Sequence, residues 1–156
     1  FAGEEMIRSL YPEAVVLRIA WLYGSGGPSF IHTMVKLLSA DGEPVKVVND
    51  QFGNPTSAEA VAEAIRFILS KSSLEGTVHA TCEGTASWYD FAAELKKLMP
   101  SLKRDLIPCT TAEFPRPAPR PKNSALEKRV LALLGYTMPD WRSALADFVA
   151  SEFPTV

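Results

Sequence analysis

Short apolar runs alternate along the chain with stretches in which apolar residues recur every three or four positions. The runs predict strands over residues 14–20, 45–48, 76–80 and 102–108. The repeats predict helices over residues 1–10, 30–38, 58–69, 88–99, 126–134 and 141–153. Because short strands alternate with helices, the pattern predicts an α/β fold. The near-continuous apolarity of the first run is typical of a strand covered on both faces of a parallel sheet.

Serine and threonine side chains mark the expected helix starts. Ser29 can cap the helix that begins at residue 30, because its side chain can accept a free backbone N–H of the first turn. Two further pairs have the spacing of a capping box, namely Thr56 with Glu59 and Ser87 with Asp90. Behind the second box, Trp88 and Phe91 lie on the apolar face of a helix, and we predict that both belong to the core.

Composition narrows the possible functions. The chain has 156 residues, enough for one domain, and a net charge of −2, which gives no general attraction to nucleic acid or to anionic membranes. The sequence has neither an apolar run of about 18–20 residues nor a signal-peptide pattern, so we expect a cytoplasmic protein. Cys82 and Cys109 are expected to be buried thiols, and His32 and His79 structural or surface side chains, because none has metal-ligand spacing.

Trp21 follows directly on the predicted strand 14–20, at the carboxyl end where open α/β sheets place ligands. An indole there can form an apolar wall against a sugar ring, with its N–H free to donate. The alternative is that Trp21 packs in the core. The glycine-rich segment 24–27 lacks the dinucleotide fingerprint G-x-G-x-x-G, so ordinary turn formation is the simpler interpretation.

A proline-rich segment over residues 114–122 must be extended, because each proline fixes its own φ and restricts the residue before it. It carries Arg116, Arg120 and Lys122, and a stiff loop that presents guanidinium groups suits a diphosphate. A solvated basic loop is the alternative. A polyproline ligand for an SH3-like partner is disfavoured because the prolines recur every second residue and form no P-x-x-P.

The polar loop 49–51 follows the predicted strand 45–48. Its side chains could hydrogen-bond a ligand, or they could end the strand through Asx-turn bonding. The sequence contains no recognisable Ser/His/Asp triad, metal cluster or paired-carboxylate site. The pattern therefore predicts an α/β domain with one ligand-binding face and without a complete set of catalytic residues.

Four blocks of the sequence resemble the dTDP-4-dehydrorhamnose reductases, a family of the extended short-chain dehydrogenase/reductase superfamily. The blocks cover residues 17–24, 47–56, 87–92 and 117–124 and occur in the order of the family. The resemblance implies the C-terminal portion of an NAD(P)-binding Rossmann-like fold. Arg116 stands where the family often has threonine, which adds a charge whose contact with the ligand is open.

The same resemblance implies a domain organisation. Residues 1–4 match the segment that directly follows the catalytic Tyr-x-x-x-Lys pair in this family, so that pair and the glycine fingerprint would lie upstream of Phe1. Residues 1–156 would then form a single substrate-binding fragment that includes the last part of the Rossmann-like sheet, about residues 1–28. The N-terminal dinucleotide-binding domain would be absent, and the fragment alone is expected to be inactive.

The activity implied by the resemblance is reduction of the C4 ketone of dTDP-4-dehydro-L-rhamnose by NADPH or NADH, giving dTDP-L-rhamnose. Trp21 would contact the sugar and Arg120 the diphosphate, with Asn123 and Gln51 as polar contacts; Ala20 and Trp21 would border the nicotinamide. Family members are also associated with magnesium, for which no ligand can be placed here, and a homodimer is expected. Alternatives are a sugar-nucleotide epimerase or dehydratase, or a non-catalytic reductase-like regulatory subunit that partners methionine adenosyltransferase.

Overall fold

The structure is a computed structural model that describes residues 1–71, 74–114 and 117–154, and it has the predicted α/β fold. Its helices are α1 (Ala2–Leu10), α2 (Phe30–Ser39), α3 (Ala58–Leu69), α4 (Trp88–Leu98), α5 (Arg129–Leu133) and α6 (Trp141–Glu152), with a 3-10 turn over Thr111–Glu113. Its strands are β1 (Val15–Arg18), β2 (Leu22–Tyr23), β3 (Val45–Val48), β4 (Phe52–Gly53), β5 (Thr56–Ser57), β6 (Gly76–His79), β7 (Ala86–Ser87) and β8 (Leu106–Cys109).

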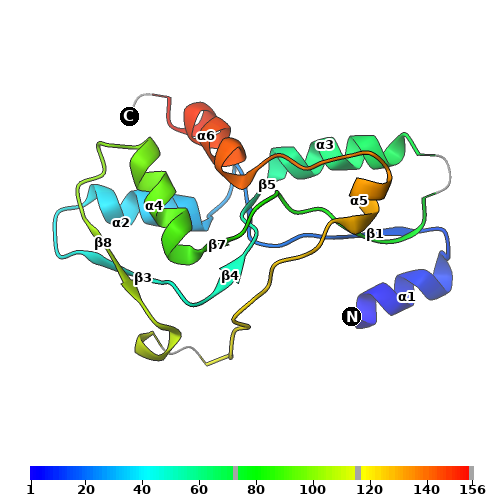
Figure 1. The fold of residues 1–156 in the computed structure, drawn as a ribbon, viewed down its shortest axis with the longest axis horizontal. Helices are drawn as coiled ribbons and strands as arrows, with labels where there is room; N and C mark the ends of the chain where they lie inside the picture. Colours follow the sequence, from blue (N-terminus) through cyan, green and yellow to red (C-terminus); the bar gives the residue numbers. More distant parts are fainter. Residues whose placement is uncertain (72–73, 115–116, 155–156) are drawn as a thin grey trace.

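The described strands form four two-stranded sheets instead of one continuous sheet. The pairs β1–β6, β2–β5 and β3–β8 are parallel, and β4–β7 is antiparallel. The molecule is elongated, with α2, α4, β3 and β8 toward one end, α1 and β1 toward the other, and the short strands β4, β5 and β7 between them (Figure 1). The short central pairs therefore connect the two ends.

Two of the three expected helix caps are confirmed. The Ser29 side chain accepts the backbone N–H of His32, and Ser87 with Asp90 forms a complete capping box at α4. The box predicted at Thr56 is wrong by one residue, because Ser57 caps α3. Thr56 still belongs to β5, and its hydroxyl donates to the carbonyl of Asn54 while accepting the N–H of Cys82.

Aromatic side chains from several elements make the centre of the core. The ring of Tyr23 lies 5.5 Å from that of Phe91 and 5.2 Å from that of Phe148, so β2, α4 and α6 pack together. Cys82 and Cys109 are buried and free, as predicted, and burial raises the pKa of both thiols. These cysteines act as small apolar side chains.

Three predicted elements are shorter than expected by three residues or more, and backbone conformation or hydrogen bonds explain the differences. The strand 14–20 ends at Arg18, ahead of Trp21, which has a positive φ of 48°. The helix expected from residue 126 begins only at Arg129, because the N–H of Leu126 donates to the Asn54 side chain at 2.7 Å. Residues 103–104 bond the carbonyl of Leu38, so β8 begins at Leu106.

Candidate functional site

A pocket of about 420 Å³ lies where the end of the β1 segment, β4, α4 and the proline-rich loop meet. It is lined by Ala20, Trp21, Gln51, Trp88, Arg120, Pro121 and Ser124. Four of the five site residues expected from the sequence therefore come together, although they are up to a hundred residues apart in the chain. The exception is Asn123, which lines neither this pocket nor the cavity beside it.

Trp21 is held in the pocket from several sides. Its indole stacks on that of Trp88 with ring centroids 3.6 Å apart and planes 6° from parallel. Gly53 lies so close that an added β-carbon would be 2.4 Å from Cε2 of the indole. The backbone of Trp21 has φ of 48°, a conformation that costs about 1–3 kcal/mol in a residue other than glycine and needs surrounding contacts to persist.

The indole N–H of Trp21 is not free, contrary to the sequence prediction. Nε1 donates to Oγ of Ser124 at 3.1 Å. With Trp88 stacked on the ring and Gly53 against it, a ligand can reach only the part of the indole that these two residues leave open. The expectation is therefore corrected in two respects. Only an edge of the Trp21 indole is open to a ligand, and the indole N–H already donates to Ser124.

Trp88 was predicted to lie in the core together with Phe91, and this is wrong for Trp88. Phe91 is buried, whereas Trp88 is half-buried and lines both the pocket and the neighbouring cavity. The reason is its position as the first residue of α4, directly after the cap Ser87, at the end of the helix that faces β4. An aromatic residue at the first position of a capped helix was the signal that could have identified it.

The loop 49–51 makes tertiary hydrogen bonds in place of an Asx turn. Oδ1 of Asn49 accepts the hydroxyl of Ser87 at 2.7 Å. Oδ1 of Asp50 accepts the N–H and the hydroxyl of Thr111 at 2.9 and 2.7 Å, and these bonds hold the pKa of Asp50 below its ordinary value. The Gln51 amide donates to Oγ1 of Thr111 at 3.0 Å, so Thr111, which sequence reasoning missed, orients it.

Backbone hydrogen bonds fix the loop that carries Arg120. The N–H of Phe52 donates to the carbonyl of Lys122, and the N–H of Ser124 donates to the carbonyl of Phe52, each at 2.8 Å. The side chain of Asn123 bonds locally, since its Oδ1 accepts the N–H of Ala125 at 2.9 Å. Arg116 lies outside the described residues. The loop thus presents Arg120 to the pocket, while Asn123 lies outside the lining of the pocket.

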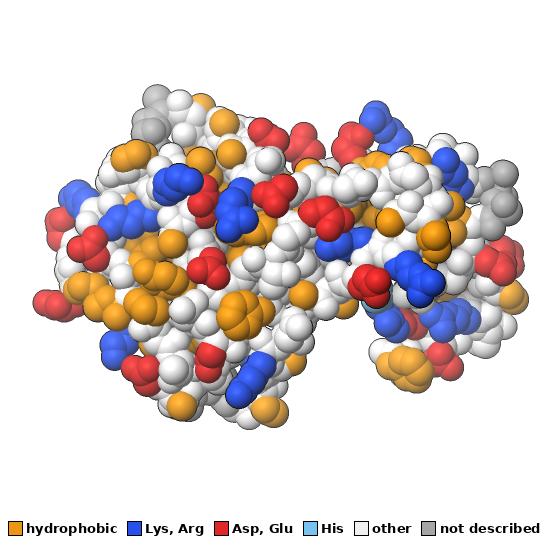
Figure 2. Space-filling model, in the orientation of Figure 1, with side chains coloured by type: hydrophobic (Ala, Val, Ile, Leu, Met, Phe, Trp, Pro, Cys, Tyr) orange, Lys and Arg blue, Asp and Glu red, His pale blue; other side chains and the backbone are white. Residues whose placement is uncertain are grey.

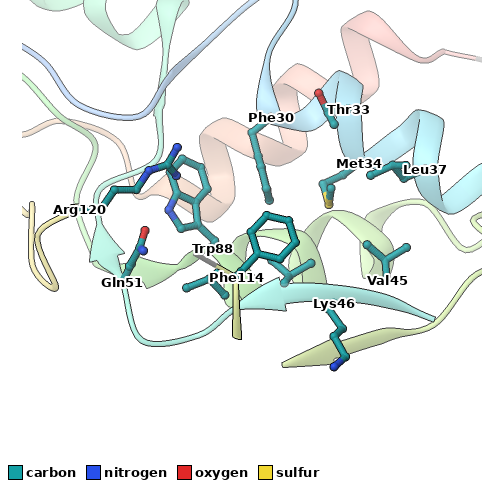
Figure 3. A pocket seen from close by; sticks show the side chains of 12 residues that line it. Phe30, Thr33, Met34, Leu37, Val45, Lys46, Gln51, Trp88, Phe114 and Arg120 are labelled. Carbon is teal, nitrogen blue, oxygen red and sulfur yellow. The ribbon is translucent and has the colours of Figure 1, made fainter. Parts of the chain in front are cut away.

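A second, mostly apolar cavity of about 280 Å³ adjoins the pocket and was not predicted. Phe30, Met34, Leu37, Val45 and Phe114 lie on one side, and Gln51, Trp88 and Arg120 lie on the other (Figure 3). These last three residues line both spaces. Arg120 therefore stands between an apolar cavity and the pocket that contains Trp21. Helical spacing predicted the helix that carries Phe30 and Met34 but gave no indication of a cavity beside it.

No group of three or more His, Cys, Asp or Glu side chains that could hold a metal ion occurs among the described residues. The Nε2 atom of His32 pairs with Glu152 at 3.1 Å, and Nδ1 of His79 bonds the carbonyl of Glu127. The described residues therefore give no support to the magnesium expected from the resemblance. Of the helices described, none is long and apolar enough to cross a membrane.

Comparison with known proteins decides the family. Residues 1–153 match the RmlD substrate binding domain. The chain belongs to this family. As an RmlD substrate-binding domain it is 40% identical over 157 residues to a probable dTDP-4,6-dihydroxy-2-methyloxan-3-one 4-ketoreductase of Streptomyces antibioticus, covering 97% of this chain and 53% of that protein. It is also 40% identical over 153 residues to the dTDP-4-dehydrorhamnose reductase of Mycobacterium tuberculosis H37Rv, covering 96% of this chain and 50% of that protein.

Among solved structures, the RmlD domain resembles dTDP-4-dehydrorhamnose reductase from Bacillus anthracis in complex with NADP. The TM-score is 0.87 at 34% identity, and the match covers 96% of this chain and 52% of that one. The chain spans about half the length of the curated relatives it matches. The expected family and the expected Rossmann-related fold are thus confirmed.

Proposed function

We propose that this chain is the nucleotide-sugar-binding half of a reductase that converts dTDP-4-dehydro-L-rhamnose to dTDP-L-rhamnose with NADPH or NADH. The observation that carries the proposal is the position of Arg120, between an apolar cavity and the pocket of Trp21. A flat base, a diphosphate and a sugar follow one another in the substrate in the same order. The order of the apolar cavity, Arg120 and the pocket of Trp21 therefore matches the order of the base, the diphosphate and the sugar.

The cavity beside α2 has the properties of a base site. Its walls are aromatic and aliphatic side chains, and ligand pockets are typically apolar with a few placed polar groups. Arg120 would bind the diphosphate, because a guanidinium forms two parallel hydrogen bonds to phosphate oxygens. Gln51, oriented by Thr111, would add a polar contact where the two spaces meet. The sugar would then lie against the open edge of Trp21.

The residues of this chain would bind and orient the sugar, while NADPH or NADH would supply the hydride. The sequence contains no Tyr-x-x-x-Lys, so we assign no proton transfer to it. Ala20, which lines the pocket beside Trp21, is the residue that we assign to the nicotinamide side. A relative of known structure binds NADP, which supports this choice of cofactor. Magnesium has no role in the proposal.

We further propose that α1 packs against a dinucleotide-binding half. No residue of α1 is buried, although Met6, Ile7 and Leu10 are large apolar side chains exposed by 66, 45 and 67%. Hydrophobic side chains are visible on the surface at this end of the molecule (Figure 2). An apolar helix face of this kind marks an interaction site. The length of the relatives, about twice that of this chain, supports a partner of that size.

A second substrate deserves a test because one relative carries a different activity in its name. The Streptomyces antibioticus protein is as identical to this chain as the mycobacterial reductase, yet it is described as a ketoreductase for another dTDP-linked keto-sugar. Both substrates share the dTDP part and differ in the sugar. The sugar that fits the edge of Trp21 would therefore decide between them.

Isothermal calorimetry of dTDP and dTDP-L-rhamnose tests the proposal. Arg120→Ala should weaken the binding of both ligands by about 1.5–3 kcal/mol, or about 10- to 150-fold, because a charged hydrogen bond is lost. Arg66→Ala is a matched control, since Arg66 is exposed on α3 and pairs only with Glu63 among the described residues. Unchanged affinity in Arg120→Ala would show that the loop does not bind the diphosphate.

A further inference from the structure

Trp21 needs external support to keep its orientation. Its φ of 48° lies in the left-handed region, which bulky side chains rarely adopt. The carbonyl of Trp21 accepts the N–H of Thr56 at 3.2 Å, which holds the backbone. Stacking on Trp88 sets the plane of the indole, and Gly53 limits its position from a second side. A directional contact at Nε1 would fix the direction in which the edge of the ring points.

The hydroxyl of Ser124 provides the directional contact. Oγ accepts Nε1–H of Trp21 at 3.1 Å and donates its own hydrogen to the carbonyl of Phe52 at 3.0 Å. The donation fixes the lone pairs of the hydroxyl toward the indole, because the hydrogen is already engaged. Ser124 also lies four residues after Arg120 on the same loop, and both line the pocket.

We propose that Ser124 is a positioning residue that aligns the edge of Trp21 for the sugar and is not needed for binding the nucleotide part. The inference rests on the function proposed above. The separation follows from the hydrogen bonds of the loop. Arg120 is held through the backbone pairs of Phe52 with Lys122 and Ser124, and neither pair uses the serine hydroxyl. Removing the hydroxyl frees the indole and also removes its bond to the carbonyl of Phe52, but the two backbone bonds of the loop to Phe52 remain and keep the guanidinium in place.

The variant Ser124→Ala tests the binding of the nucleotide part and of the sugar part of the ligand separately. Affinity for dTDP-L-rhamnose should fall by about 3- to 10-fold, because the neutral hydrogen bond that orients Trp21 is lost, while affinity for dTDP should change by less than about twofold. NMR of the ligand-free chain gives a second measurement, which would stay unchanged if Ser124 acted only by contacting the sugar directly. The three tryptophans of the chain give three indole N–H signals, and the Trp21 signal should exchange faster with water in Ser124→Ala.

Ser124→Thr, which keeps the hydroxyl, should restore both the slow exchange of the Trp21 N–H and the affinity for dTDP-L-rhamnose. Equal loss of affinity for dTDP and for dTDP-L-rhamnose in Ser124→Ala would overturn the inference, because Ser124 would then hold the whole loop. Loss of sugar affinity with an unchanged Trp21 signal would also overturn it, in favour of direct contact. Failure of the unaltered chain to bind dTDP would instead refute the proposed function.

Discussion

Two tryptophans of this domain lie against glycines, and their surroundings differ in every other respect. Trp141 is fully buried at the start of α6, edge-on to Phe91 with ring centroids 5.9 Å apart, and a β-carbon added to Gly84 would be 2.8 Å from its Cδ1. Its Nε1–H has no hydrogen-bond partner among the described residues. Trp21 is half-buried, has a positive φ and donates its N–H to Ser124.

The comparison separates two roles of a tryptophan, namely stabilising the fold and holding its ring in a defined orientation at a site. At Trp141 the burial of apolar area outweighs an unsatisfied N–H, which itself costs about 1–3 kcal/mol. At Trp21 less area is buried and backbone strain is added, so the indole contributes less to stability. What the surroundings of Trp21 provide is orientation, through a stack and a directional hydrogen bond. An orientation maintained against strain is typical of functional sites.

The largest effect is expected for stability at Trp141. Trp141→Ala should lower the free energy of unfolding by about 3–5 kcal/mol, because it leaves a cavity beside Phe91. Trp21→Ala should lower it by clearly less, since the ring of Trp21 is only half-buried. Urea unfolding followed by circular dichroism measures both. Equal losses would mean that the two indoles have the same structural role, which would invalidate the comparison.

A single methyl group at Gly53 should affect the site more than the fold. Gly53→Ala would place a β-carbon 2.4 Å from the indole of Trp21, so the ring must shift from its present position against Trp88. We expect a loss of stability of about 1–3 kcal/mol, as for an overpacked contact, and a loss of affinity for dTDP-L-rhamnose. Unfolding curves and calorimetry report the two effects.

Gly27→Ala is the matched control for Gly53→Ala. No atom lies within 4 Å of the β-carbon that it would add. Its affinity for dTDP-L-rhamnose should equal that of the unaltered chain. If Gly53→Ala binds the sugar nucleotide as well as this control does, the site tolerates a displaced indole, and the orientation of Trp21 is not important for binding.

Patterns along the chain predicted the helices and the four longer strands, missed the two-residue strands β2, β4, β5 and β7, and predicted tertiary contacts poorly. The helix over 58–69 and the strand 45–48 were found because apolar periodicity is a local property. Trp21, Gln51 and Arg120 were selected from strand ends, loop chemistry and a family resemblance, and the structure places them around one pocket. Local patterns contain no information on which distant loop a side chain will meet.

Thr111 and Ser124 show what the sequence could not supply. Each is an ordinary polar residue in its own segment and becomes important only through a partner more than fifty residues away, Asp50 for the first and Trp21 for the second. The apolar cavity was missed for a related reason. Helical spacing marks Phe30 and Met34 as apolar positions but does not reveal that a space remains beside them.

The smallest effect concerns the carboxylate that orients the polar side of the site. Hydrogen bonds from Thr111 hold the pKa of Asp50 below its ordinary value of about 3.9, so the charged form is favoured in the folded state. The stabilisation is fully present above the ordinary value and is lost as pH falls through the lowered one. Because Asp50 is only half-buried, solvent partly screens the interaction and the change should be small.

Acid should therefore weaken sugar-nucleotide binding slightly through Thr111, which also holds the amide of Gln51. Affinity for dTDP-L-rhamnose measured from pH 6 down to about pH 3.5 should fall more steeply in the unaltered chain than in Asp50→Asn, which retains an oxygen acceptor but has no charge to lose. Taking the difference between these two proteins removes the contribution of the other carboxylates. Parallel curves would show that Thr111 positions Gln51 without help from the charge of Asp50. In that case the hydrogen bonds of Thr111, and not the charge of Asp50, orient the polar side of the site.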